Sequence, residues 1–211
     1  AHLPKVLALP INASAIGHYR VTEPMIALES AGRAAGIISY AHPDLIEVER
    51  HSPDIMVLQG RYSQLRVDEI VDLKTYSNAR RIYELDDYVI HVPKKNEHVR
   101  GMPDSQEMER LVRRGISLCD RVVVSTQPLA DALSSMHHDI RVVPNMLTPA
   151  LWQDLRSVRR AGRKPRVGWG GGTSHTGDLE IIAEVVRLLA DEVDWVFFGM
   201  CPPALRVGSK R

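Results

Sequence analysis

Short apolar segments alternate with longer amphipathic ones along most of this chain, and no other sequence feature constrains its fold as strongly. Each apolar segment has the length of one strand, whereas the segments between them have the length and periodicity of helices. Strands that alternate with helices at this spacing predict an α/β fold with a Rossmann-like, doubly wound parallel sheet. The predicted strands of this sheet span residues 5–11, 35–40, 54–59, 81–87, 121–125 and 140–143.

Recognisable start signals precede several of the predicted helices. Thr22 is a plausible N-cap, and Pro24 would then lie in the first helical turn. Asp104 and Glu107 form a sequence of the capping-box type, and Thr126 is a third N-cap candidate. The predicted helices span residues 22–32, 63–76, 104–119 and 126–136.

Polar residues follow several of the predicted strands at the point where each strand ends. In parallel α/β sheets, ligands bind at the carboxyl ends of the strands. The sequence therefore predicts that the loop 12–17, Gln59, the acidic pair Asp86 and Asp87, and Ser125 share one rim of the sheet. The acidic pair is the most informative member, because a carboxylate at this rim can act as a general base or orient a substrate hydroxyl. A solvated strand end is the alternative interpretation of the pair.

A second strand–turn–helix unit begins at residue 165, where an apolar strand leads into Gly170, Gly171 and Gly172 and then into an amphipathic helix. Glycines in such a turn let backbone N–H groups approach an anion that a Cβ atom would exclude. The three glycines, with Thr173 and His175, are therefore candidate anion-binding residues. A tight turn without a ligand is an equally good interpretation of this motif alone.

Two well-known nucleotide-binding motifs do not fit this turn. The phosphate-binding loop that ends in Gly-Lys-Ser/Thr is absent. The dinucleotide pattern G-x-G-x-x-G is met at Gly168 and Gly170 but fails at Thr173, and no acidic residue ends the next strand, residues 195–200. NAD binding, and with it a dehydrogenase activity, is therefore a minor alternative.

The composition is that of a globular protein, with 44% hydrophobic residues and a net charge of +1 among 211 residues. This charge balance gives no indication of a nucleic-acid partner. Cys119 and Cys201 have unrelated spacing and are expected to be buried thiols in a reducing compartment, which favours a cytoplasmic location. No apolar run approaches the ~20 residues that a membrane-spanning helix requires.

A basic stretch separates the two predicted domains. We interpret residues 148–164 as a linker between an N-terminal domain, residues 1–147, and a second domain that begins at residue 165 and extends to residue 211. A solvated linker is the favoured interpretation, and weak peripheral association with the inner face of a membrane is the alternative. The basic residues are Arg156, Arg159, Arg160, Arg163 and Lys164.

Taken together, four stretches resemble the group 1 family of glycosyltransferases, which have the GT-B fold of two Rossmann-like domains, and in particular members that build bacterial surface polysaccharides such as O-antigen. The resemblance spans nearly the whole chain, although no single stretch is diagnostic. The stretches are residues 17–24, residues 82–87, residues 119–129 together with 140–145, and residues 166–179.

The resemblance implies transfer of a sugar from a nucleotide-sugar co-substrate to a glycan or lipid-linked acceptor, in a cleft between the two domains. Gly17, with His18 and Arg20, would form the loop on the acceptor and phosphate side. Asp86 and Asp87 would lie over the acceptor pocket as the catalytic acids, and residues 170–175 would form the donor-side loop. No cofactor is implied, and a divalent metal held by Glu84 and the two aspartates is a disfavoured alternative.

The chain departs from the family pattern in two places. The paired glutamates that bind the donor late in the second domain are absent, because the sequence ends before them. The glycine-containing turn expected after Asn145 is replaced by Met146 and Leu147. We therefore expect the second Rossmann-like domain to be incomplete and the chain to be inactive alone. A non-catalytic, Rossmann-like module that binds a glycan or nucleotide is the main alternative function.

Overall fold

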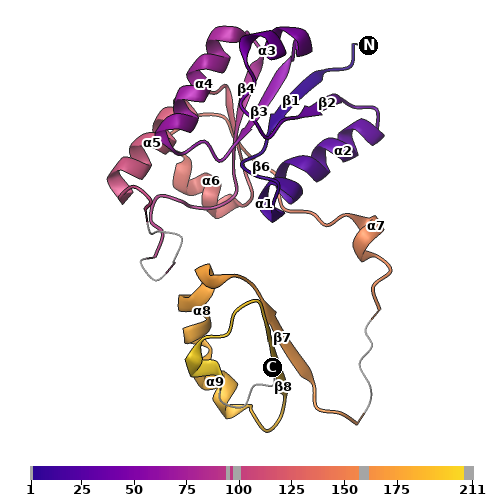
Figure 1. The fold of residues 1–211 in the computed structure, drawn as a ribbon, viewed down its shortest axis with the longest axis vertical. Coiled ribbons are helices and arrows are strands. Elements are labelled where there is room, and N and C mark those ends of the chain that lie inside the picture. Colours follow the sequence, from indigo (N-terminus) through magenta and orange to yellow (C-terminus); the bar gives the residue numbers. More distant parts are fainter. Residues whose placement is uncertain (1, 94–95, 97–100, 157–161, 207–211) are drawn as a thin grey trace. The chain divides into compact units, whose positions relative to one another are not determined.

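The chain forms two compact units in the computed structural model, which describes residues 2–93, 96, 101–156 and 162–206 (Figure 1). The first unit comprises Ala1–His91 and Pro103–Asp154, and the second comprises Val92–Met102 and Leu155–Arg211. Each unit has its own sheet.

The first unit is built on a six-stranded sheet with the order β2-β1-β3-β4-β5-β6. Every neighbouring pair in this sheet is parallel. The predicted Rossmann-like α/β sheet is therefore confirmed. Its strands are β1 (Lys5–Leu9), β2 (Ala35–Ile38), β3 (Ile55–Gln59), β4 (Arg80–Leu85), β5 (Arg121–Val124) and β6 (Ile140–Val142).

The strand order places the helices unequally on the two faces of the sheet. The connection from β1 to β2 runs in one direction along the sheet, whereas all later connections run in the other direction. Since crossovers are right-handed, the first helical segment covers one face and α3 to α6 cover the other (Figure 1). The helices are α1 (Ala15–Gly17), α2 (Glu23–Ser30), α3 (Leu45–His51), α4 (Gln64–Tyr76), α5 (Ser105–Ser117), α6 (Gln127–Leu133) and the short α7 (Pro149–Trp152).

Local capping explains where most of these helices begin. The predicted caps at Asp104 and Thr126 are confirmed, because their side chains accept hydrogen bonds from the N–H groups of the third helical residues of α5 and α6. Helix α3 was not predicted from the sequence. Its signal is a full capping box, in which Asp44 and Glu47 each accept a hydrogen bond from the other's main-chain N–H.

The predicted helix start at Thr22 is wrong. Thr22 has helical backbone angles, and the helical run begins at Ala15. Between α1 and α2 the chain forms a π-helix, His18–Thr22, in which the N–H of Glu23 bonds to His18 O. Pro24 explains this widening: it has no N–H to donate, and its ring would clash with a carbonyl four residues earlier in a regular α-helix. The proline therefore widens a continuous helix instead of starting one.

One part of the core of the first unit lies between the sheet and the layer α3–α6, and another part lies between the sheet and the helical segment that ends in α2. Leu7, Leu9, Met56, Leu58 and Tyr83 are fully buried on the strands. Cys119, just after α5, is also buried, and burial raises the pKa of its thiol to about 12. The prediction of a buried thiol is thus confirmed for Cys119, whereas Cys201 is half-buried.

The second unit contains a two-stranded parallel sheet of β7 (Arg166–Gly170) and β8 (Asp194–Phe198). The predicted single helix is divided into α8 (Thr176–Ile181) and α9 (Ala183–Leu188), with a 3-10 turn, Thr173–His175, before α8. The helical segment is amphipathic as predicted, because Leu179 and Val186 are buried with Trp195 in a separate hydrophobic cluster.

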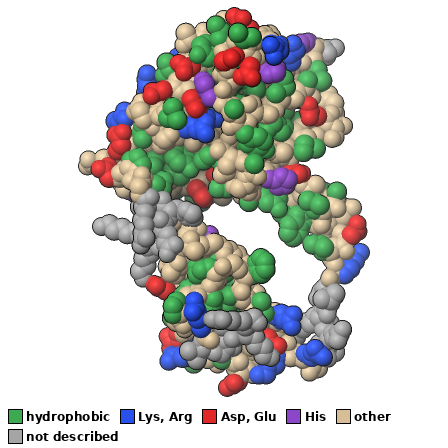
Figure 2. Space-filling model, viewed as in Figure 1, with side chains coloured by type: hydrophobic (Ala, Val, Ile, Leu, Met, Phe, Trp, Pro, Cys, Tyr) green, Lys and Arg blue, Asp and Glu red, His purple; other side chains and the backbone are tan. Residues whose placement is uncertain are grey.

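Acidic and basic side chains are interspersed over the helices of the first unit, and apolar side chains gather over the α7 segment (Figure 2). The apolar side chains of this segment include Leu147 and Leu151, which are 59% and 60% exposed. Within the part of the chain that the structure describes, no helix is both long and apolar enough to cross a membrane.

Candidate functional site

The predicted rim is assembled by side chains that tie neighbouring strand ends together. Gln59 ends β3, where its amide oxygen accepts a hydrogen bond from the N–H of Ile11 at 3.0 Å and its amide nitrogen donates to Ile16 O at 3.3 Å. Ser125, just after β5, donates through its hydroxyl to Asp86 O at 2.7 Å. These bonds hold the loop after β1 against β3, and the acidic pair after β4 against the end of β5.

Gly17 lies where this loop turns back on the start of the helix. A Cβ atom at this position would lie 1.9 Å from Asn12 O, far inside any tolerable contact. The glycine is therefore required by a close approach of two backbone segments. The close packing is enough to explain a glycine at this position even if no ligand binds there. A place for Gly17 beside the donor phosphates stays a prediction.

Arg20 and Glu84 form a buried ion pair at this rim. Arg20 Nε donates to Glu84 Oε1 at 2.7 Å, and the two side chains are 4% and 3% exposed. Arg20 Nη1 also donates to Val143 O at 2.6 Å and to Asn145 Oδ1 at 2.9 Å. The π-helix, β4 and the segment after β6 are thus joined at one guanidinium group.

Glu84 is the functional candidate that sequence reasoning weighed only as a metal ligand. Its signal is a charged residue in the apolar part of a strand, between Tyr83 and Leu85, because a buried charge needs a partner. The partner, Arg20, lies 64 positions away, so the sequence alone did not pair them.

Two acids of the rim, Glu84 and Asp86, have a raised pKa. Burial raises the pKa of Glu84 to about 7, and the opposing effect of Arg20 only partly offsets it. Burial and, next, the like charge of Asp87 raise the pKa of Asp86. Tyr62 lies near enough that both aspartates, after burial, raise the pKa of its hydroxyl. A carboxylate with a raised pKa is a better general base near neutral pH than an ordinary aspartate.

His18, the remaining residue of the predicted loop, is engaged elsewhere. Its Nε2 lies 3.3 Å from Glu23 Oε1, and its ring meets the edge of the Tyr19 ring. Glu23 in turn accepts a hydrogen bond from the hydroxyl of Thr148. His18 therefore links the π-helix to the start of α2, and a role in substrate binding stays a prediction.

In the second unit the predicted donor residues lie in one turn after β7. The N–H of Gly171 donates to Phe198 O at 3.0 Å, and a Cβ atom on Gly171 would lie 2.6 Å from the Trp169 ring. This N–H is therefore already used, and the glycine is explained by packing. Gly172 has open space around its Cα, and the His175 ring lies 2.8 Å from the carboxylate of Asp178. Gly172 and Thr173 are consequently better anion-binding candidates than Gly171 or His175.

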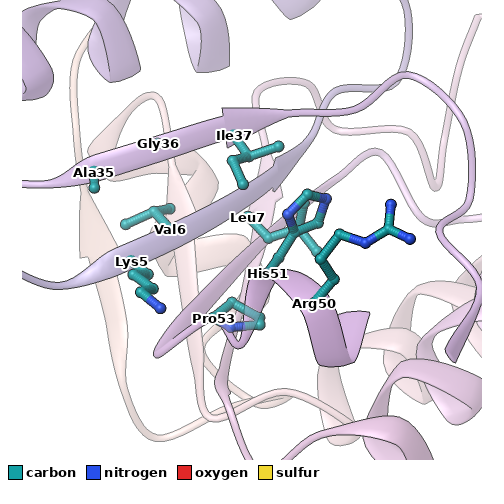
Figure 3. Close-up of a pocket in the computed structure, with 9 residues that line it drawn as sticks. All are labelled: Lys5, Val6, Leu7, Ala35, Gly36, Ile37, Arg50, His51 and Pro53. Atoms are coloured by element: carbon teal, nitrogen blue, oxygen red, sulfur yellow. The ribbon is translucent and has the colours of Figure 1, made fainter. Parts of the chain in front are cut away.

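A small cavity of about 230 Å³ lies at the opposite end of the first sheet (Figure 3). It borders the first residues of β1 and β2, with Lys5, Arg50 and His51 among its lining residues. The Lys5 and Arg50 side chains point apart in Figure 3 and do not converge on one point. This cavity therefore lacks the arrangement of an anion site.

Comparisons with known proteins do not assign the chain to a family. No protein-family model matches it, and no curated protein matches it. Among the described residues, no group of three or more His, Cys, Asp or Glu side chains is placed to hold a metal ion. The glycosyltransferase resemblance, the reaction and the absence of a metal requirement therefore stay predictions.

The raised pKa of Glu84 predicts that the stability of the first unit depends on pH. The native state holds the proton of Glu84 up to about pH 7, whereas an unfolded glutamate loses it near its ordinary value of 4.5. The stabilising contribution is therefore complete below pH 4.5 and is lost as the pH rises towards 7, by at most about 3 kcal/mol. Urea denaturation of the protein and of Glu84→Gln between pH 4.5 and 8 measures this difference. A wild-type curve parallel to that of Glu84→Gln would contradict the assignment.

Proposed function

We propose that the protein is a glycosyltransferase that moves a sugar from a nucleotide-sugar donor to an acceptor hydroxyl in surface polysaccharide biosynthesis. The observation that carries this proposal is the acid group at the carboxyl rim of the first sheet. There a half-buried aspartate with a raised pKa, Asp86, lies beside a second acid and within the field of a fixed cation, Arg20. Ligands of parallel α/β sheets bind at this rim.

The proposed reaction involves the transfer of one proton and the departure of one leaving group. Asp86 accepts the proton of the acceptor hydroxyl as the new bond forms between that oxygen and the anomeric carbon of the sugar. The bond between the anomeric carbon and the phosphate oxygen breaks, and its electron pair leaves with the nucleoside diphosphate. Burial and, next, the like charge of Asp87 keep the pKa of Asp86 raised, which suits it to accept this proton.

A nucleotide-sugar screen tests this function against its alternatives. We expect the protein, incubated with UDP-, GDP- and TDP-sugars and an acceptor fraction of glycans and lipid-linked saccharides, to release nucleoside diphosphate only when the acceptor is present. Coupled detection of the diphosphate and mass spectrometry of the product give the measurement. Saturable nucleotide binding without product would favour the non-catalytic module, and hydride transfer from NADH would favour the dehydrogenase.

A further inference from the structure

An apolar groove of about 630 Å³ lies on the face of the six-stranded sheet that α3 to α6 do not cover. Its floor includes Ile82 and Val123 of the sheet, and Leu28 of α2 forms one wall. Met146 and Leu147, shortly after β6, form the other wall. The apolar surface of this second wall continues beyond the groove, along the segment that leads out of the first unit.

This segment, residues 146–155, exposes an unusual number of large apolar side chains (Figure 2). Five of its ten residues are large apolar residues that are between 44% and 72% exposed. Single exposed apolar residues are normal, whereas a group of them marks an interaction surface. A solvated linker, the interpretation that the sequence favoured, does not explain this group. Its members are Met146, Leu147, Leu151, Trp152 and Leu155.

Hydrogen bonds fix the start of the segment and satisfy its turn. The hydroxyl of Thr148 donates to the carboxylate of Glu23, the first residue of α2. Within α7, the N–H of Leu151 donates to Thr148 O at 3.0 Å, and the N–H of Gln153 donates to Pro149 O at 2.9 Å. These main-chain donors are already paired, so the turn can enter a less polar environment without losing them.

A strongly basic stretch follows the apolar residues. Residues 155–166 contain six Arg or Lys residues and no acidic residue. Two of the six, Arg159 and Arg160, lie outside the residues that the structure describes. A chain extends by at most about 3.6 Å per residue, so Leu155 and Lys164 are never more than about 32 Å apart and can reach one flat surface together. The described members are all exposed: Arg156, Arg163, Lys164 and Arg166.

We propose that the apolar side chains of residues 146–155 insert into the surface of an anionic lipid bilayer, while the basic stretch contacts the lipid phosphates. Burial of apolar area and attraction to anionic lipid together determine how strongly a protein binds a bilayer surface. Trp152 suits this position, because tryptophan has an apolar ring with one polar N–H and is enriched at membrane interfaces. This inference does not depend on the proposed sugar transfer.

The distribution of charge favours a lipid surface over other partners. A two-fold dimer formed through this segment would bring two basic stretches together, and like charges repel. A nucleic acid would attract the basic stretch, but its phosphates offer no apolar surface to Leu151 and Leu155. An anionic bilayer complements both the apolar residues and the basic ones.

Vesicle flotation of the full chain tests the proposal directly. We expect binding to phosphatidylcholine vesicles that contain about 30% phosphatidylglycerol, and binding that is weaker by about tenfold or more to phosphatidylcholine alone. Raising the salt from about 0.1 M to about 1 M shortens the screening length from about 10 Å to about 3 Å and should also weaken binding. Absence of binding to the anionic vesicles, or equal binding to both kinds of vesicle, would overturn the proposal.

Leu151→Glu tests the insertion of the apolar residues. It removes apolar surface and adds a negative charge, so binding to the anionic vesicles should weaken by about tenfold or more. Leu65→Glu is the matched control, because Leu65 is an exposed leucine on α4, on the other face of the sheet. Unchanged binding in Leu151→Glu, or an equal loss in Leu65→Glu, would contradict the insertion.

The double variant Arg163→Gln, Lys164→Gln tests the basic stretch. Each basic residue near an anionic surface raises the affinity about fivefold, so the double variant should bind the anionic vesicles about 25-fold more weakly. Arg113→Gln, Arg114→Gln is the matched control, because these arginines are also adjacent and exposed, on α5. An equal loss in the two double variants would show that overall charge, and not this stretch, causes the binding.

Fluorescence quenching by brominated lipid locates the insertion. Quenching should be strong in the wild-type protein and mostly lost in Trp152→Phe, which keeps an apolar ring and should still bind. Equal quenching in both proteins would place the contact elsewhere and overturn the proposal.

Two other results would assign the segment to a different partner and overturn the lipid contact. One is a dimer, seen by analytical ultracentrifugation without lipid, that Leu151→Glu dissociates. The other is binding of duplex DNA by a protein that does not bind the anionic vesicles.

Discussion

Replacing Asp86 by asparagine should lower kcat for sugar transfer between about 100-fold and 10,000-fold, the range that general base catalysis contributes. Asparagine has nearly the same shape but cannot accept the proton of the acceptor hydroxyl. Because the hydroxyl of Ser125 donates to the main-chain oxygen of Asp86 and not to its side chain, the position of the residue should survive the change. The rate of acceptor-dependent diphosphate release measures the effect.

Asp68→Asn is the matched control for this change. Asp68 lies on α4 and accepts a hydrogen bond only from the exposed Gln64 among the contacts seen in the described residues, so its substitution should change kcat less than twofold. A loss of activity in Asp68→Asn as large as that in Asp86→Asn would indicate a general effect on folding. An Asp86→Asn protein with the wild-type rate would remove the proposed base.

Replacing Arg20 by methionine should destabilise the first unit by about 3–5 kcal/mol at pH 8, where Glu84 is mostly ionised. The methionine fills similar volume, but Glu84 is left buried without its cation, and Val143 O and Asn145 Oδ1 lose their donor. Amide hydrogen exchange of β4 and β5 is the suitable measurement, because it reports the opening of this unit alone. The loss should be smaller at pH 5, where Glu84 can hold a proton.

Arg110→Met provides the comparison for Arg20→Met. Arg110 pairs with Glu107 on the surface of α5, where both side chains are about half exposed. Exposed pairs contribute little to stability, so this variant should be close to wild type. Equal losses in the two variants would mean that the Arg20–Glu84 pair does not stabilise the rim.

The parallel sheet could be predicted because the sequence signals for its strands are local. Each strand carries its own apolar run, and the alternation with helices limits the order in which the strands can pair. The rim residues Gln59, Asp86 and Ser125 followed from the same rule, since they come directly after strands. The caps at Asp104 and Thr126 were also predictable, because capping depends on residues only three positions apart.

The features that were not predicted depend on distant residues or on backbone geometry. The π-helix follows from Pro24 acting on a helix that starts seven residues earlier than predicted, at Ala15. The pairing of Arg20 with Glu84 requires the fold to bring the π-helix over β4. The groove results from the unequal distribution of helices on the two faces, which no single segment of sequence encodes. The role of Gly171 stays a prediction, because packing against Trp169 and ligand binding select the same residue type.

The pH dependence of sugar transfer in the wild-type protein and in Asp87→Asn tests the central claim most directly. If Asp86 is the base, the rate should fall on the acid side with an apparent pKa above the ordinary aspartate value of 3.8. Removing the like charge of Asp87 should then shift this acid-side fall in rate, the acid limb of the pH profile, to lower pH while activity is retained. A limb at the same pH in both proteins, or the loss of all activity in Asp87→Asn, would contradict the assignment of Asp86 as the base.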